Sequence, residues 1–224
     1  MSRATKRSAS LKGKCIAVIV DMVRSRDLAN LERANTQERF TAFVDLLNRK
    51  YDSALASRFA ITLGDEFQGL LLDPAIIPDL VWDIETRFTG PVLRIGFGLG
   101  ALSTPLREFA INIDGPALHE ARASIEIAKK ADYLGGVFSG FGESENLILN
   151  GFARLLRSHR AVLYPQQMKI VELLRQGLTQ TEAARVLRLT KQAVSKSAKA
   201  SGWVAYQQGE QGWRAALTKL VSLE

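Results

Sequence analysis

The segment FAITLGDEFQGLL, residues 59–71, places two adjacent carboxylates, Asp65 and Glu66, between two apolar runs. Apolar runs of this length are typical of strands, and Gly64 supplies the backbone freedom that a tight turn needs. The segment therefore predicts an antiparallel hairpin with the two acids in its turn. The question is whether these acids only form a turn or help to bring a metal ion and a phosphate together.

The sequence around this hairpin predicts a regular succession of strands and helices. The run CIAVIVDM is almost continuously apolar and β-branched, as expected of a central strand, and Asp21 falls near its end. Amphipathic spacing elsewhere predicts helices. In chain order, the predicted elements are a strand at 15–22, a helix at 31–51, strands at 58–63 and 67–72, a helix at 76–88, a strand at 91–102 and a helix at 114–131.

The order strand, helix, strand, strand, helix, strand is the split βαβ pattern of ferredoxin-like domains. We therefore expect an α+β fold in which a sheet with antiparallel strands carries helices on one face. Short connections and right-handed crossovers place the first strand beside the third, at the centre of the sheet. Asp21 should then lie near Asp65 and Glu66.

Asp21, Asp65 and Glu66 are the candidate metal ligands. Carboxylates that are brought together repel each other unless one is protonated or a cation lies between them. Mg²⁺ binds one or two carboxylates and completes its coordination with water and substrate phosphates. The pattern therefore predicts a site for Mg²⁺ or Mn²⁺, with a solvated turn as the alternative.

A second group of polar residues lies at the start of the helix predicted at 114–131. Asp114 is a suitable helix cap, and His119 and Arg122 are three residues apart, so they share one helix face. With Gly115 these residues are candidates for a ligand pocket, in which His119 acts as a base or a hydrogen-bond donor and Arg122 binds a phosphate. A partly buried structural histidine is the alternative for His119.

Charge is distributed unevenly along the chain, whose net charge is +7 at pH 7. The first residues carry Lys and Arg but no acid, the middle carries more acids than bases, and the last third is basic again. Such asymmetry favours separate tasks for separate parts. We expect a basic flexible tail at 1–14, a palm-like α+β domain at 15–144, and a linking helix with a small DNA-binding domain at 145–224.

The boundary between the two domains is expected in the glycine-rich stretch 133–146, followed by a linking helix at 145–159. Near the end of the chain, residues 202–217 are predicted to form a wing-like hairpin followed by a final helix. Trp203 and Trp213 are expected in the core of the small domain.

Residues 164–202 carry the most specific pattern in the chain. Thr179 and Glu182 have the spacing of a capping box at the start of a short helix, and Thr190 opens another helix after a brief turn. This arrangement predicts a helix-turn-helix whose second helix fits a major groove of about 12 Å, with a bundle for protein contacts as the alternative. The candidate DNA-contacting residues are Thr190, Lys191, Gln192, Ser195, Lys196 and Lys199.

Three resemblances follow from these motifs. Residues 164–202 resemble the helix-turn-helix regions of bacterial regulators and the promoter-reading domains of sigma factors. The sequence LGDEF resembles the Gly-Gly-Asp-Glu-Phe hairpin of diguanylate cyclases, and roughly residues 15–125 are similar to class III nucleotidyl cyclases. That similarity implies that the acids at Asp21 and Asp65 hold two metal ions.

The third and closer resemblance is to the SatD family, through VDMV at 20–23, TLGDEFQG at 62–69 and DGPALHEAR at 114–122. The cyclase pattern is incomplete, because Leu63 replaces the first glycine of the hairpin and Val23 stands where diguanylate cyclases carry a second acid. These departures favour ligand sensing over turnover.

The leading hypothesis is a DNA-binding transcriptional regulator whose palm-like domain senses a ligand such as a nucleotide with Mg²⁺. The alternative is a metal-dependent nucleotidyl cyclase or nucleotidyltransferase with an appended helix-turn-helix, for which Asp65, His119 and Arg122 are the candidate catalytic residues. A protein-interaction scaffold is a third hypothesis.

No apolar run approaches the roughly 18 residues of a membrane span, so we expect a cytoplasmic protein. Helix-turn-helix proteins usually dimerise on two half-sites, so we also expect a homodimer.

Overall fold

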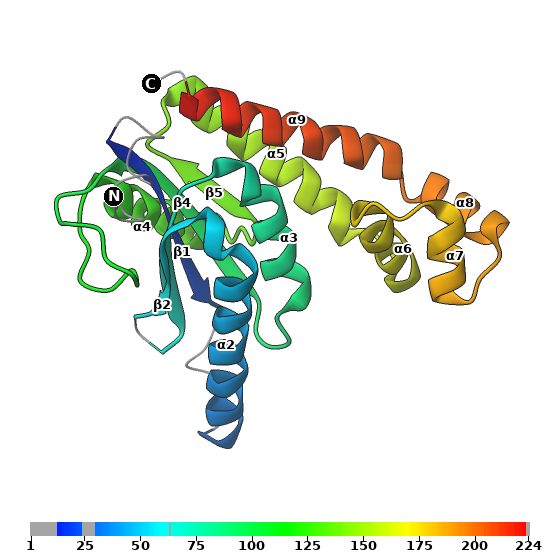
Figure 1. Cartoon of the computed structure of the whole chain (residues 1–224), viewed down its shortest axis with the longest axis horizontal. Coiled ribbons are helices and arrows are strands. Elements are labelled where there is room, and N and C mark those ends of the chain that lie inside the picture. Colours follow the sequence, from blue (N-terminus) through cyan, green and yellow to red (C-terminus); the bar gives the residue numbers. More distant parts are fainter. Residues whose placement is uncertain (1–12, 24–29, 63, 223–224) are drawn as a thin grey trace.

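Within the described residues, five strands form one mixed sheet (Figure 1). The computed structural model describes residues 13–23, 30–62 and 64–222. The strands are β1 (Lys14–Met22), β2 (Leu55–Ile61), β3 (Glu66–Leu71), β4 (Leu93–Ala101) and β5 (Gly136–Ser139). Their order is β2-β3-β1-β4-β5, in which β5 is parallel to β4 and the other pairs are antiparallel.

This topology confirms the predicted α+β fold and the split βαβ order. The first strand, β1, lies at the centre of the sheet between β3 and β4. Nearly all of the tail predicted at 1–14 lies outside the described residues, and so does Leu63.

Helices pack on the sheet and also extend away from it. They are α2 (Asn30–Tyr51), α3 (Ile77–Arg87), α4 (Pro116–Lys130), α5 (Glu143–Ala161), α6 (Pro165–Arg175), α7 (Gln180–Leu187), α8 (Lys191–Ala200) and α9 (Trp203–Ser222). In Figure 1, α5 and α9 run side by side from the sheet toward α6, α7 and α8. None of the helices in the described segments is both long and apolar enough to cross a membrane.

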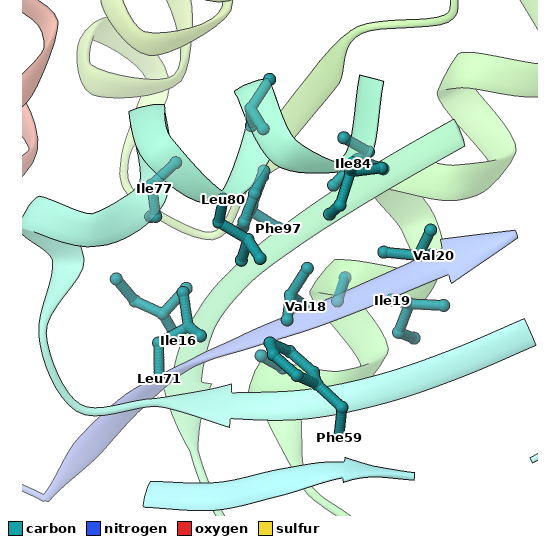
Figure 2. Close-up of a cluster of buried hydrophobic side chains, with 14 of the residues drawn as sticks. Ile16, Val18, Ile19, Val20, Phe59, Leu71, Ile77, Leu80, Ile84 and Phe97 are labelled. Carbon is teal, nitrogen blue, oxygen red and sulfur yellow. The ribbon is translucent and has the colours of Figure 1, made fainter. Parts of the chain in front are cut away.

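The prediction that helices cover only one face of the sheet is wrong. Figure 2 shows Ile77, Leu80 and Ile84 of α3 over one face, near Val18 of β1 and Phe97 of β4. The opposite face is covered by α4, which packs against β4 and β1.

Glycines in β4 allow this close approach of α4. Gly96, Gly98 and Gly100 alternate with large apolar residues, so their missing side chains all belong to the α4 face. A Cβ added at Gly98 would lie 2.1 Å from the backbone nitrogen of Ala121 and 2.3 Å from the backbone oxygen of Ala117. The helix backbone therefore occupies the space that side chains take elsewhere.

The segment 133–146, where the boundary between the two domains is expected, is partly folded into regular structure. It contains β5 and the start of α5, and β5 extends the sheet beyond β4. Phe138 of β5 stacks on Phe97 with ring centroids 4.7 Å apart. The strand has only four residues and is flanked by glycines, which is why its composition resembles that of a linker.

The wing-like hairpin predicted at 202–217 is also wrong, because α9 is continuous from Trp203 to Ser222. The glycines that suggested a turn lie instead against α5. A Cβ on Gly212 would lie 3.3 Å from the Phe152 ring, and one on Gly209 would lie 3.4 Å from the Leu156 side chain.

The hydrophobic core of the sheet continues into α5 and α9. Leu149, Leu156, Tyr206 and Trp213 belong to the same buried cluster as the sheet residues, and Trp213 contacts Phe138 of β5. Trp213 is therefore a core residue, as expected, but the core is that of the sheet. A second, smaller cluster holds α6, α7 and α8 together, formed by Ile170, Leu174, Ala183, Ala184, Val194 and Ala198.

Ion pairs connect α3 to the helices that follow the sheet. Arg160 of α5 donates to Glu85 of α3 at 2.6 Å, and both side chains are at most 5% exposed. Arg175 of α6 lies 2.6 Å from Asp79 of α3 and 2.7 Å from Glu210 of α9. A buried charge that loses its partner is costly, so these contacts fix the position of α6 relative to the sheet.

We expect Gly98→Ala to destabilise the protein by at least about 2 kcal/mol, because the new methyl group overlaps the α4 backbone. Gly209→Ala is the matched control, since it faces a side chain and gains up to about 1 kcal/mol of helix stability. Urea unfolding of both variants measures the difference. Equal stabilities would contradict the close packing of α4.

Candidate functional site

Two of the predicted acids lie together at one end of the sheet. Asp21 of β1 and Glu66 of β3 are paired residues in the antiparallel ladder, so their side chains point to the same face. This is the face covered by α4, and basic side chains of α4 reach both acids. The predicted proximity of Asp21 to the hairpin is confirmed.

Glu66 is almost completely buried and fully hydrogen-bonded. Its side chain is 4% exposed. The guanidinium of Arg122 donates to both carboxylate oxygens, with Nη2 2.7 Å from Oε1. Thr62 donates its hydroxyl to Oε1 at 2.9 Å. Bidentate contacts of this kind are the stronger form of an arginine–carboxylate pair, so Arg122 neutralises the charge of Glu66.

Asp21 lies beside Glu66 in a less balanced environment. Its nearest cation is Lys129 of α4, whose Nζ lies 3.4 Å from Oδ2. Burial raises the pKa of the Asp21 carboxyl above its ordinary value, Lys129 opposes this shift, and the neighbouring charges of Asp65 and Glu66 raise the pKa further. Asp65 is therefore close enough to act on Asp21, and its backbone oxygen accepts a hydrogen bond from the Met22 amide at 2.9 Å.

This donor set does not fit a carboxylate-bound metal ion as it is arranged. Both oxygens of Glu66 are engaged by Arg122 and one also by Thr62, while Lys129 faces Asp21. Across the residues that the structure describes, no group of three His, Cys, Asp or Glu side chains is placed to hold a metal. The positive charge that metal ions would supply comes here from α4.

The residues of the predicted ligand pocket do not all meet at one site. Asp114 accepts from the Gly115 amide at 2.8 Å and lies 2.8 Å from His119 Nε2, and both side chains are largely exposed. Lys129 lies ten residues beyond His119, or about 15 Å along a helix. Arg122, in the middle of α4, joins the acids, whereas Asp114 precedes the helix and contacts His119 in its first turn.

Gly115 is held by packing. Its φ of +147° is a conformation that other residues rarely adopt, and a Cβ here would lie 2.6 Å from the Ser103 backbone nitrogen.

Two further basic residues lie at this site, and sequence reasoning missed Lys129. Lys129 follows Arg122 by seven residues and lies on the same helix face, so the spacing alone could have identified it. Arg94 of β4 pairs with Asp21 in the ladder, and its side chain is only 13% exposed. Its guanidinium lies 3.5 Å from the exposed Asp132, but its Nε atom is buried with no hydrogen-bond partner in the described part of the chain.

A second candidate surface lies on α8. The helix begins after Thr190, whose hydroxyl accepts from the Ala193 amide at 3.1 Å. Val194 and Ala198 are buried against α6 and α7, so the rest of the helix faces outward. The candidate DNA-contacting residues Thr190, Lys191, Gln192, Ser195, Lys196 and Lys199 are all exposed.

Comparison with known proteins identifies a family and finds distant structural similarity to solved structures. The model of the SatD family matches residues 15–215. A search of curated proteins finds no match. Among solved structures, a bacterial light-regulated adenylyl cyclase is similar over 56% of this chain and 74% of its own, with 12% identity and a TM-score of 0.42.

We expect Arg122→Ala to lower the free energy of unfolding by about 2 kcal/mol, because it leaves Glu66 buried without its cation. The loss is smaller than the ~3–5 kcal/mol of a fully buried pair, since Arg122 is partly exposed. Urea unfolding of Arg122→Ala, Glu66→Gln and the double variant measures the coupling. Lys130→Ala, on an exposed residue of α4, is the control. Strictly additive losses would show that the pair contributes nothing.

We expect Asp21→Asn to stabilise the protein at neutral pH. The raised pKa means that ionised Asp21 costs stability above its folded-state pKa, and this cost disappears as the pH falls toward the unfolded value of about 4. The melting temperature of Asp21→Asn should therefore exceed that of the unsubstituted protein at neutral pH, and this difference should shrink as the pH falls to 4. Asp45→Asn, at an exposed carboxylate of α2, is the control. A gain that is independent of pH would contradict this account.

Proposed function

The chain belongs to the SatD family, and from this premise we propose that it is a DNA-binding regulator that inserts α8 into the major groove of duplex DNA. The observation that carries the proposal is the pair α7 and α8, joined by a tight turn and held by a core of their own with α6. A short helix followed by an outward-facing second helix is the arrangement by which helix-turn-helix proteins read DNA.

The turn between α7 and α8 supports a fixed orientation of the second helix. Arg188 adopts a left-handed conformation with φ 56° and ψ 42°, and the Leu189 amide donates to the Ala184 carbonyl at 2.9 Å. Val194 is completely buried. A helix held at both its turn and its inner face presents its outer side chains with little freedom, which favours readout of base edges.

The exposed chemistry of α8 also supports contact with a polyanion. Lys191, Lys196 and Lys199 are suited to phosphates, and Arg185 and Arg188 add exposed positive charge on the preceding helix and turn. Gln192 carries an amide of the kind that pairs with the edge of adenine.

The acids and bases at the end of the sheet are the proposed sensing site of this regulator. Arg122 is 42% exposed and Lys129 is 39% exposed, so an anion can reach both from solvent. A phosphate group would compete with Glu66 for Arg122. The catalytic alternative is less favoured, because bases of α4 already balance the acids that would have to bind two metal ions.

We expect the full-length protein to bind duplex DNA of mixed sequence at low salt, and Lys196→Ala to weaken this binding for every sequence. Removal of one phosphate contact should reduce the slope of log affinity against log salt by about 1. Fluorescence anisotropy at several salt concentrations measures both effects, with Lys130→Ala as the control for loss of charge outside α8. No binding at low salt, or equal effects of the two variants, would refute the proposal.

A further inference from the structure

A small pocket lies between α3, the start of β4 and α5. Its volume is about 130 Å³, the space that about four water molecules take in the liquid. Two charged residues line it, Glu85 and Arg157. Apolar side chains line it as well, those of Ile84, Phe88, Leu93 and Leu134. Figure 2 shows Ile84 on the face of the sheet that α3 covers, so this pocket is separate from the acids under α4.

Glu85 has one carboxylate oxygen with several donors and one with none. Its side chain is 5% exposed. Oε2 accepts from Nε and Nη2 of Arg160 at 2.9 and 2.6 Å, and Nη1 of Arg157 lies 3.5 Å from the same atom. Oε1 is buried and accepts no hydrogen bond from the residues that the structure describes. A buried carboxylate oxygen without a donor costs stability, so a bound group that donates to Oε1 would remove this cost.

Positive charge exceeds negative charge around this carboxylate. Glu85 carries one negative charge, whereas Arg157 and Arg160 each bring a positive one. Arg157 lines the pocket and its side chain is 28% exposed, so a ligand can reach the guanidinium N–H groups that do not face Glu85. A ligand that donates to Glu85 and also carries a negative charge therefore complements both charged residues of the pocket.

Tyr133 adds a second polar group without a partner in this region. Its hydroxyl is buried and forms no hydrogen bond within the described part of the chain. Burial raises the pKa of Tyr133 to about 12, and the charge of Glu85 raises it as well, so the two groups are close enough to act on each other. Arg154 lies over the Tyr133 ring, 4.8 Å from its centroid, and adds a third arginine to this side of α5.

We propose that this pocket binds a small carboxylate that carries a hydroxyl or an amine on the neighbouring carbon. The hydroxyl or amine donates to Oε1 of Glu85, and the carboxylate of the ligand accepts from Arg157. A carboxylate without such a donor would meet the unpartnered oxygen of Glu85 with like charge, and a donor without a carboxylate would leave Arg157 without a second anion. The volume of the pocket limits the ligand to a few carbon atoms.

The position of the pocket gives its ligand an effect on the connection between helices. Glu85 belongs to α3, whereas Arg157 belongs to α5, which is followed by α6. A ligand held by both residues joins α3 to α5 with contacts beside the buried pair of Glu85 and Arg160. Binding therefore strengthens the attachment of the helices that carry α8 to the sheet. The inference does not rest on DNA binding, because the ligand contacts no residue of α8.

The first test is thermal unfolding of the full-length protein, without DNA, with four compounds of similar size. Lactate and alanine carry both groups, propionate lacks the donor, and isopropylamine lacks the carboxylate. A ligand of the folded state at 100 times its Kd raises the melting temperature of a protein of this size by about 5–10 °C. We expect such a rise only with lactate or alanine, and the more effective of the two identifies the donor as a hydroxyl or an amine.

The second test locates the bound compound. Arg157→Gln removes the contact to the ligand carboxylate but leaves Arg160 on Glu85, so the protein should stay folded and bind about tenfold more weakly or worse. Arg185→Gln, at an exposed arginine of α7, is the matched control and should bind as the unsubstituted protein does. The methyl NMR signals of Leu93 and Leu134 should shift on binding, because both residues line the pocket.

No rise in melting temperature with lactate or alanine up to high millimolar concentration would overturn the proposal, as would an equal rise with propionate or isopropylamine. Binding that Arg157→Gln leaves unchanged, or NMR shifts confined to other parts of the protein, would show that the compound binds elsewhere. Because both tests are done without DNA, either failure leaves the proposed function of α8 untouched.

Discussion

The close contact between α4 and the glycine face of β4 is the constraint on which the site depends. With side chains at residues 96, 98 and 100, the helix would have to lie farther from the sheet, as the 2.1 Å approach to the Ala121 nitrogen shows. At its observed distance, α4 brings Arg122 onto Glu66 and Lys129 toward Asp21. The acids at the end of the sheet thus acquire their counter-ions from a helix whose position is set by the absence of side chains on a neighbouring strand.

Much of the sheet was predictable, because its strands carry strong local signals. The apolar run of β1 is recognisable as a strand, and the hairpin at Gly64 indicates the strand β3 that follows it. In the structure these two strands are neighbours, and their ladder pairs Asp21 with Glu66. Glycine was the main source of error, since its role depends on tertiary contacts. In β5 it flanks a strand too short to be recognised, and at Gly209 and Gly212 it allows α9 to pack on α5 instead of forming a turn.

The meeting of the two acids was predictable because it depends on strand order. Asp21 and Glu66 meet because β1 and β3 are neighbours, which a topological rule supplies. The counter-ions depend on the direction in which α4 crosses the sheet. Because α4 runs antiparallel to β4, the start of the helix, with His119, lies away from Asp21, whereas Lys129 lies close to it. Spacing within the helix could show that Arg122 and Lys129 share a face, but it could not show that this face lies over Asp21 and Glu66, since it carries no information about the strand beneath.

The ion pairs of the molecule are of two kinds. Those at the end of the sheet are partly exposed and can be exchanged, whereas the buried pair between α3 and α5, here called the joint, is fixed. At the end of the sheet, Arg122 and Lys129 remain partly open to solvent, so another anion can compete for them at modest cost. At the joint, Arg160 and Glu85 are both buried, and separating them would take from each buried charge its closest ionic partner. A ligand that rearranges the first pair therefore acts on α4 and this end of the sheet while α3 holds α5 and α6 in place. Any signal to α8 would have to pass through this fixed joint as movement of a rigid unit, since the joint itself is too costly to open.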